Sequence, residues 1–162
     1  MKRAIYPGSF DPITVGHIDI LERSLSVFDE ITIVVASSSR KTSLLQPDER
    51  VELVKDVFKG KRRVKVDRWD GLIMDYARER GSHAVIRGLR AASDFEYEFM
   101  MAAMNKRLNP DVETFFMMTG QNYFFISSSM IKELFRYGGD ISPYVPPLVW
   151  KRLKEKRKAG DL

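Results

Sequence analysis

The sequence predicts an α/β fold in which a mostly parallel, five-stranded sheet is covered by helices on both faces. The first observation is that short runs rich in β-branched and aromatic residues alternate five times with longer segments of helical periodicity. Such an alternation is typical of consecutive βα units, whose strands run parallel. The second observation is the length of 162 residues, which suits one domain. No internal repeat or linker divides the chain, so a single domain over residues 1–162 is expected.

The strands and helices can be placed in order along the chain. Strands are expected at RAIYPG, EITIVVA, RVKVDRW, HAVIRG and ETFFMMTG, and helices near residues 15–28, 47–59, 72–80, 93–108 and 127–137. Thr14 can cap the first helix, which puts His17 in its first turn. Pro47 opens the second helix, and Ser93 with Glu96 forms a capping box for the fourth. A basic helical tail is expected from about residue 148.

The composition excludes several classes of protein. Apolar residues make up 44% of the chain, too many for a disordered protein, and the longest aliphatic runs are too short to span a bilayer. There is no cysteine, which excludes disulfides, thiolate catalysis and cysteine-bound metal. Because there is no signal-peptide pattern either, we expect a cytoplasmic location and no membrane partner.

The net charge of +5 is concentrated at one end of the chain. From Lys151 onward there are six basic and two acidic residues, whereas the rest of the chain is almost balanced. A run such as KRLKEKRK is ordinarily a solvated helix end. We therefore do not expect nucleic-acid binding, although a nucleic-acid-binding module that uses this tail remains the alternative from a different class.

Four polar clusters lie where predicted strands end. They are Gly8–Phe10 after the first strand, Ser37–Lys41 after the second, Arg87–Arg90 after the fourth and Ser127–Ser129 after the fifth. In an open parallel sheet, ligands bind beyond the carboxyl ends of the strands. The sequence therefore predicts that these clusters form one site.

The residue types in two of these clusters suit an anion. Ser9, the backbone amides around it and His17 near a helix N-terminus favour negative charge. His17 could instead be a half-buried histidine with its hydrogen bonds satisfied. Arg87 and Arg90 suit phosphate oxygens, and the alternative for them is salt bridges to neighbours such as Asp94. Neither a GxGxxG nor a GxxxxGK[ST] pattern is present.

The other candidates carry weaker signals. The three consecutive serines offer hydroxyls and helix N-terminal amides, although they could simply cap a helix. Lys41 lies in a polar loop that could bring a cation over a ligand, or it could be solvated. Glu98 and Asn105 share a helix face with Met101 and Ala102 between them, which suits a partly apolar ligand or a core helix with polar edges. No His, Asp and Glu cluster has a convincing metal-ligand spacing.

Three segments in combination resemble a known enzyme family. YPGSFDPITVGHIDIL, AVIRGLRAASDFEYEFMMAAMN and FISSSMIKEL resemble bacterial phosphopantetheine adenylyltransferase, of the HxGH nucleotidylyltransferase superfamily. The resemblance runs from Lys2 to about Pro147, and the first histidine of the superfamily motif is Thr14 here. It implies a Rossmann-like fold, a homohexamer, and transfer of the adenylyl group of ATP to 4'-phosphopantetheine. The products would be dephospho-coenzyme A and pyrophosphate, on the route to coenzyme A.

The resemblance also implies roles for individual residues. Ser9 would contact both substrates, and His17 would stabilise the reacting α-phosphate. Phosphopantetheine would be bound by Lys41, Ile73 and Arg87. ATP would be bound by Ser9, His17, Phe10, Gly88, Leu89, Arg90, Glu98, Tyr123, Phe124, Phe125, Ile126, Ser127, Ser128 and Ser129. Relatives commonly have a small polar residue at position 124, so Phe124 leaves the shape of the nucleotide pocket open.

The implied chemistry needs no catalytic cysteine or carboxylate pair. A phosphate monoester is a dianion at neutral pH and can attack ATP directly, without a general base or a covalent intermediate. We expect His17, Lys41, Arg87 and Arg90 to supply positive charge to the developing oxyanions. Mg²⁺ is expected on the triphosphate, held mainly by phosphate oxygens and water.

Two further expectations concern the rivals and the division of the site. The nearest rival is a nucleotidylyltransferase that uses nicotinate mononucleotide or a sugar-alcohol phosphate, and the IRGLRAASDFEYE stretch argues against it. Arg87 and Lys41 are expected to face phosphopantetheine, and Arg90 and Glu98 the nucleotide. Deletion of residues 151–162 is expected to leave adenylyl transfer largely intact.

Overall fold

The computed structural model describes residues 1–36, 43–90 and 92–160, with Ala92 and Ser93 described by their backbone alone, so Lys41 lies outside the described residues. One sheet contains the strands β1 (Arg3–Gly8), β2 (Glu30–Ala36), β3 (Val64–Trp69), β4 (Ala84–Leu89) and β5 (Glu113–Met118). Its strand order is β3-β2-β1-β4-β5, and every pair is parallel. The predicted five-stranded parallel sheet is therefore confirmed, and β1 lies at its centre.

The helices follow the predicted alternation with small changes at their ends. They are α1 (Val15–Ser24), α2 (Pro47–Val57), α3 (Ile73–Arg80), α4 (Ala92–Leu108), α5 (Ser128–Arg136) and α6 (Pro147–Ala159). Pro47 begins α2 as predicted, and Glu49 accepts a 2.8 Å hydrogen bond from the Gln46 amide. The first helix ends at Ser24 rather than near residue 28, because the chain turns there and brings Phe28 into the core.

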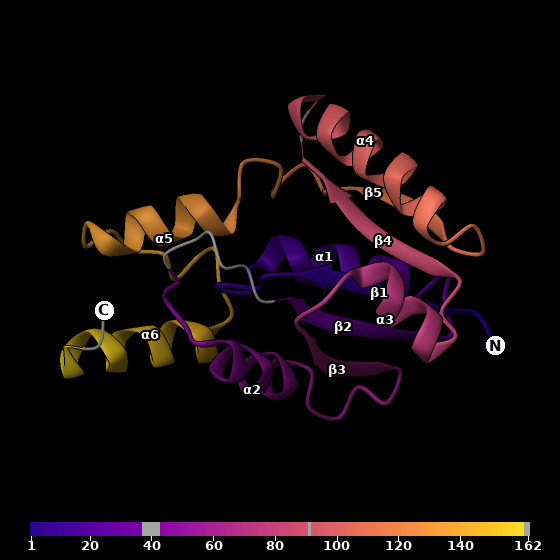
Figure 1. Cartoon of the computed structure of the whole chain (residues 1–162). Coiled ribbons are helices and arrows are strands. Elements are labelled where there is room, and N and C mark those ends of the chain that lie inside the picture. Colours follow the sequence, from indigo (N-terminus) through magenta and orange to yellow (C-terminus); the bar gives the residue numbers. More distant parts are fainter. Residues whose placement is uncertain (37–42, 91, 161–162) are drawn as a thin grey trace.

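The two faces of the sheet are covered unequally (Figure 1). On one face, apolar side chains of α1, α2, α5 and α6 join the larger core, which includes Leu21, Leu53 and Phe135. On the other face, Met74, Tyr76 and Ala77 of α3 pack with apolar residues of the strands in a smaller core. The fully buried central strands read as continuous apolar runs, as parallel sheets require.

The C-terminal helix is part of the core, which corrects the expectation of a solvated tail. Val149 and Leu153, four residues apart, are completely buried. Lys156 forms an ion pair with Glu49 of α2 at 2.8 Å, and the Arg157 guanidinium lies 3.7 Å from the centre of the Phe135 ring. Removal of residues 151–162 would therefore take a buried leucine from the core, so we expect it to destabilise the protein.

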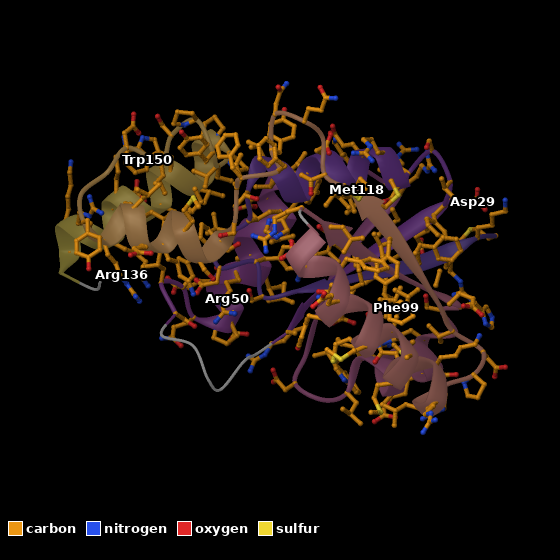
Figure 2. The ribbon with its side chains drawn as sticks, turned by 90° about the horizontal axis from the view of Figure 1, so that it is seen from above. Asp29, Arg50, Phe99, Met118, Arg136 and Trp150 are labelled. Carbon is orange, nitrogen blue, oxygen red and sulfur yellow. The ribbon has the colours of Figure 1, made fainter. Side chains whose placement is uncertain are left out.

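By contrast, α4 and the edge strand β5 leave much apolar surface uncovered. Exposed large side chains gather there: Phe95, Tyr97, Phe99, Met100, Met101, Met104, Leu108, Phe115 and Met118. Figure 2 shows Phe99 and Met118 at one end of the molecule, with Arg136 and Trp150 at the other. We call the exposed apolar side chains of α4 and β5 the α4–β5 surface. Within the residues that the structure describes, no helix is long and apolar enough to cross a membrane.

Candidate active site

A cleft of about 780 Å³ lies at the carboxyl ends of the strands, where the sequence predicts the site. It lies between the β1–α1 loop, the end of β4, one face of α4 and the start of α5. The structure brings eleven of the predicted residues into its lining: Ser9, His17, Ile73, Arg87, Gly88, Arg90, Glu98, Ile126, Ser127, Ser128 and Ser129. Asn105, Met101 and Ala102 also line it, so the shared face of α4 points into the cleft as expected.

The loop between β1 and α1 is shaped by an unusual backbone and a buried ring. Phe10 has a φ of 45°, in the left-handed region that side chains other than glycine seldom adopt, and its ring is 1% exposed. The ring packs edge-on against Tyr6 and lies 5.1 Å from the His17 ring. Phe10 as a whole is buried and does not line the cleft. Its ring packs against the His17 ring and helps to hold that ring in place.

Thr14 and His17 form a reciprocal cap at the start of α1. The Thr14 hydroxyl accepts a hydrogen bond from the His17 amide at 3.4 Å, and the Thr14 amide donates to Nδ1 of His17 at 3.0 Å. A backbone amide can only donate, so Nδ1 must be the acceptor and the ring proton of neutral His17 is on Nε2. The predicted N-cap is thus confirmed, and it also fixes the tautomer.

The same surroundings decide the charge of His17. Burial, together with the positive charges of Arg90 and Arg87, lowers the pKa of His17 to about 4. The ring is therefore neutral at pH 7. The sequence analysis expected His17 to supply positive charge, whereas in the structure burial and the two arginines disfavour the charged ring. What His17 offers is an Nε2–H donor.

Buried charges fix the loop to two other segments of the site. The Asp11 carboxylate, 2% exposed, accepts hydrogen bonds from the Leu44 and Leu45 amides and forms a 3.2 Å ion pair with Lys132 of α5. Arg50 of α2 donates to the Ser9 and Leu45 carbonyl oxygens. The β1–α1 loop, residues 43–46 and α5 are therefore held together by hydrogen bonds that water cannot readily replace.

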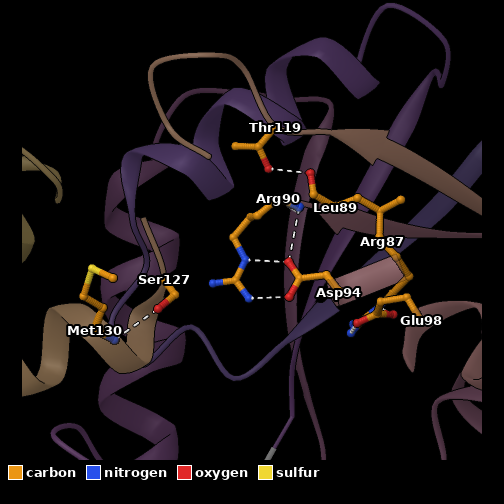
Figure 3. Close-up of polar contacts among 8 residues, drawn as sticks. All are labelled: Arg87, Leu89, Arg90, Asp94, Glu98, Thr119, Ser127 and Met130. Atoms are coloured by element: carbon orange, nitrogen blue, oxygen red, sulfur yellow. Dashed lines mark hydrogen bonds and ion pairs between the residues drawn. The ribbon is translucent and has the colours of Figure 1, made fainter. Parts of the chain in front are cut away.

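Arg87 is bound by a carboxylate of α4. Its Nε and Nη2 donate to the two oxygens of Glu98 at 2.7 and 2.6 Å (Figure 3). Its Nη1 donates to the Pro7 carbonyl at 3.0 Å. Burial alone would lower the pKa of Arg87, but its hydrogen bonds with Glu98 and the charge of that carboxylate outweigh this effect and raise it. Glu98 thus belongs with Arg87, whereas the sequence analysis assigned the two to different substrates.

Arg90 is bound in the same manner by Asp94, one turn before Glu98 on α4. Nε and Nη2 of Arg90 donate to the Asp94 carboxylate at 2.9 and 3.0 Å. The salt-bridge alternative that the sequence left open is therefore present in the structure. It does not remove the arginine from the cleft, because both residues line it and the Arg90 side chain is 39% exposed.

The end of β4 is packed tightly against α1 and β5. A Cβ at position 88 would come within 2.3 Å of the Ile20 Cδ1 atom, so a larger residue would require the Ile20 side chain to move. The Leu89 carbonyl accepts hydrogen bonds from the Thr119 amide and hydroxyl, while the Leu89 side chain is buried. Gly88 and Arg90 line the cleft, and Leu89 between them does not.

The start of α5 forms the opposite wall. The Ser127 hydroxyl caps the helix by accepting a hydrogen bond from the Met130 amide at 3.1 Å. Ser128 donates its hydroxyl hydrogen to the Pro12 carbonyl at 2.9 Å and so ties the helix to the β1–α1 loop. Both hydroxyls are therefore hydrogen-bonded within the protein. The N-terminal amides of α5 are the feature of this wall that favours anions.

Some predicted residues are not part of the lining, and some lining residues were missed. The side chains of Phe10, Leu89, Tyr123, Phe124 and Phe125 are not among those that line the cleft, and the Phe124 side chain is 57% exposed. The missed lining residues include Tyr6, Leu72, Tyr97 and Thr119. Tyr6 is 4% exposed and lies in a continuous run of buried residues of β1, so nothing in the sequence distinguishes it from the core. Burial raises its pKa well above the ordinary value, so its phenol stays protonated.

The cleft lacks a protein cage for a metal ion among its described residues. No group of three or more His, Cys, Asp or Glu side chains in the described ranges could hold one. Both carboxylates of α4 that line the cleft, those of Asp94 and Glu98, are bonded to arginines. With two arginines, a histidine donor and a helix N-terminus facing one space, the arrangement is suited to binding phosphate groups and stabilising charge on their oxygens.

Comparisons with known proteins agree with this chemistry. The model of the family described as cytidylyltransferase-like matches residues 5–134. A phosphopantetheine adenylyltransferase from Staphylococcus haemolyticus is 53% identical over 156 residues, which cover 96% of this chain and 97% of that protein. The enzyme of the same name from Syntrophus aciditrophicus is 48% identical over 155 residues, covering 96% and 94% of the two chains.

The fold has a counterpart among solved structures. A crystal structure from Vibrio parahaemolyticus, which carries the provisional name nicotinate-nucleotide adenylyltransferase, superposes with a TM-score of 0.63 at 22% identity. It covers 94% of this chain and 99% of that one, and at this identity it shows the fold alone. The sequence relatives show more than the fold, since they are about half identical over nearly their whole length. This chain therefore belongs to the phosphopantetheine adenylyltransferase family and carries the cytidylyltransferase-like domain.

Proposed function

We propose that the protein transfers the adenylyl group of ATP to the phosphate of 4'-phosphopantetheine, giving dephospho-coenzyme A and pyrophosphate. The observation that carries this proposal is the cleft in which His17, Arg87 and Arg90 converge at the carboxyl ends of β1 and β4. These residues bind phosphate groups well, and the Nδ1 lone pair of neutral His17 accepts the Thr14 amide hydrogen bond, so it is not available for nucleophilic attack. Family membership supplies the identity of the two substrates.

The proposed reaction is a direct displacement at the α-phosphorus of ATP. An oxygen of the phosphopantetheine phosphate forms a bond to this phosphorus, while the bond to the bridging oxygen of the β-phosphate breaks and pyrophosphate leaves. The attacking phosphate is already a dianion near neutral pH, since its second pKa is about 6, so no residue has to remove a proton. The protein must hold the two phosphates in line and stabilise the charge of the transition state.

His17 would donate its Nε2–H to an α-phosphate oxygen. Its ring is oriented by the Thr14 amide at Nδ1 and supported by the Phe10 ring, so the donor is in place before substrate arrives. A preorganised donor of this kind costs no reorganisation during the reaction. Because the ring is neutral at pH 7, its contribution is a hydrogen bond, and the positive charge comes from the arginines.

The arginines and Lys41 would divide the phosphates between them. Arg90, opposite the start of α5, would bind the β- and γ-phosphates of ATP, and Arg87 would bind the phosphate of phosphopantetheine together with Lys41. Glu98 would hold Arg87 in position through their ion pair, and it would also contact the nucleotide. Ser9 and Gly88, which line the cleft, would contribute backbone donors to ATP, and Ile73 would contact the phosphopantetheine arm.

Mg²⁺ is proposed as the metal partner of ATP. It would be bound chiefly by phosphate oxygens and water, which fits a cleft whose described carboxylates are already paired with arginines. When bound, it would neutralise part of the triphosphate charge. Arg90 and the α5 amides would then orient the pyrophosphate group as it leaves.

We also propose a homohexamer that works in the cytoplasm, the latter in keeping with the cysteine-free sequence. The α4–β5 surface supports assembly, because contiguous exposed apolar surface of this kind marks an interface between proteins. Light scattering coupled to gel filtration would give the assembled mass. A monomer at every concentration would contradict the assembly.

The test of function is a product assay. The protein is incubated with ATP, Mg²⁺ and phosphopantetheine, and dephospho-coenzyme A and pyrophosphate are measured; absence of product at high enzyme concentration would exclude the proposal. A parallel reaction with nicotinate mononucleotide or glycerol phosphate as the acceptor tests the rival transferases. A salt titration of DNA binding tests the nucleic-acid alternative, because phosphate contacts give a steep dependence on salt.

A further inference from the structure

Asp94 is hydrogen-bonded to both the backbone amide and the guanidinium group of Arg90. Its carboxylate accepts hydrogen bonds from the Arg90 amide at 3.2 Å, from Nε at 2.9 Å and from Nη2 at 3.0 Å. The main chain and the far end of the side chain are thus bonded to the same two oxygens. This closed arrangement fixes the side-chain torsions of Arg90 between them, which a simple ion pair would leave free.

The contact leaves one edge of the guanidinium available. A guanidinium can bind an oxyanion through its Nε–Nη2 edge or through its Nη1–Nη2 edge. Asp94 occupies the first edge, and no residue in the described part of the chain accepts a hydrogen bond from Nη1 of Arg90. Figure 3 shows the guanidinium extending toward Ser127 and Met130 at the start of α5. Arg90 and Ser127 both line the cleft.

Arg87 provides an internal comparison. It uses the same Nε–Nη2 edge for Glu98, but its Nη1 already donates to the Pro7 carbonyl. Neither Asp94 nor Glu98 is more than 25% exposed, so both pairs are partly shielded from solvent. Of the two arginines, Arg90 is the one that keeps a complete edge for a ligand.

We propose that Asp94 is a positioning residue that presents the Nη1–Nη2 edge of Arg90 to the pyrophosphate part of the nucleotide. The inference rests on the proposed function, since it supposes that this part of the cleft receives the triphosphate. A solvent-exposed arginine loses rotamer freedom when it binds an anion, and this loss weakens binding. Asp94 already orders the Arg90 side chain in the folded protein, so this loss of rotamer freedom occurs on folding and does not weaken anion binding.

The opposite role for Asp94 makes the opposite prediction. If the carboxylate merely competed with phosphate for Arg90, its removal would free the arginine and strengthen anion binding. If the pair were only structural, its removal would lower stability and leave anion affinity unchanged. The sign of the change in anion affinity therefore separates the three roles.

The experiment measures binding of inorganic pyrophosphate by titration calorimetry. Asp94→Asn is expected to weaken binding about tenfold, the scale of one poorly aligned charge-assisted hydrogen bond. Glu96→Gln is the matched control, because Glu96 is an exposed carboxylate on the same helix and its removal changes the net charge equally. Affinity that is unchanged or stronger in Asp94→Asn, or no binding by the unsubstituted protein, would overturn the proposal.

A second set of variants shows whether the effect passes through Arg90. In an Arg90→Lys background, which lacks the two-nitrogen edge, Asp94→Asn should have no further effect on pyrophosphate affinity. An equal tenfold loss in that background would overturn the inference. Asp94→Ser removes the same carboxylate and provides a second test with the same expected loss, should Asp94→Asn fold poorly.

The steady-state readout is equally specific. Asp94→Asn should raise KM for ATP about tenfold and leave KM for phosphopantetheine within about twofold, whereas a structural defect would move both. Pyrophosphate binding does not require phosphopantetheine or turnover. If adenylyl transfer were absent but the pyrophosphate result held, the proposed reaction would fail while the role of Asp94 would stand.

Discussion

The two sides of the cleft are held by different kinds of contact. On the β1 side, Asp11 and the Thr14–His17 cap are bonded to backbone amides and buried groups. On the β4 side, Arg87 and Arg90 are held by carboxylates of α4, a helix whose remaining surface is largely exposed. The difference shows that the position of His17 is fixed by buried hydrogen bonds, whereas the positions of Arg87 and Arg90 depend on partly solvated ion pairs. The predictions below test this contrast.

The largest effect is expected from the buried ion pair of the β1 side. Lys132→Met leaves the buried Asp11 carboxylate without its cation, which should lower the free energy of unfolding by roughly 3–5 kcal/mol. Urea denaturation measures the change. Lys106→Met is the control, since it removes an exposed lysine paired with Glu113 and should cost less than about 1 kcal/mol. Equal losses in the two variants would contradict a special role for the buried pair.

The next effect concerns the preformed donor. His17→Ala should lower kcat about 100- to 1000-fold, the scale for loss of one transition-state donor, with smaller changes in either KM. Steady-state kinetics with both substrates measures it. The melting temperature should also fall, because the buried Thr14 amide loses its acceptor, so kcat is compared at a temperature at which the variant is fully folded. An unchanged kcat would return His17 to the role of a structural histidine.

The depressed pKa of His17 makes stability depend on pH. The folded state holds the ring neutral with a pKa of about 4, while the unfolded chain has the ordinary value of 6.5. Between these values the unfolded state binds more protons, so stability is fully present above pH 6.5 and falls as the pH drops toward 4. The loss should reach about 3 kcal/mol. Urea denaturation at several pH values gives the free energy of unfolding of the unsubstituted protein and of His17→Gln. The other titrating groups contribute equally to both, so the difference between the two curves isolates the effect of His17. Parallel curves would contradict the burial argument.

The smallest effect concerns the coupled pair on the β4 side. Arg87→Ala and Glu98→Gln should each lower kcat/KM. Because the two residues act as one unit, the loss of transition-state stabilisation in the double variant should be about 1–2 kcal/mol smaller than the sum of the two single losses. A double-mutant cycle on kcat/KM for each substrate measures the coupling. Additive losses, each confined to a different substrate, would instead support the division that the sequence alone suggested.

The fold could be predicted from local pattern, whereas most of the electrostatic partners in the site could not. Short runs rich in β-branched and aromatic residues, alternating with segments of helical period, place the five strands and the helices α1 to α5, and Thr14 can be identified as a cap from its position before an apolar helix. The burial of α6 was missed, although Val149 and Leu153 at a spacing of four carry the signal. Helical charge runs are so common on surfaces that the apolar pair beneath them was overlooked.

The pairing in the site depends on distances that no local pattern contains. Lys132 is 121 residues from Asp11, and Glu98 is 11 residues from Arg87, so which carboxylate meets which cation follows only from the sheet order. The charge of His17 similarly depends on burial and on two arginines from another strand. Sequence reasoning could name most residues of the cleft and left the Arg90–Asp94 pair open, but the protonation of His17 and the Arg87–Glu98 and Asp11–Lys132 pairs required the packed structure.

The Asp11–Lys132 contact has a consequence for how the protein is synthesised. Asp11 leaves the ribosome early, but its cation lies in α5, and translation at about 5–20 residues per second separates the two by several seconds. During that time the nascent chain can pair β1 with β2 and later with β4, yet an ionised carboxylate in the loop lacks its counter-charge. We therefore expect the β1–α1 loop, which carries Ser9 and leads into the helix of His17, to reach its final conformation only after α5 has emerged. The reacting centre would then be among the last parts of the molecule to form.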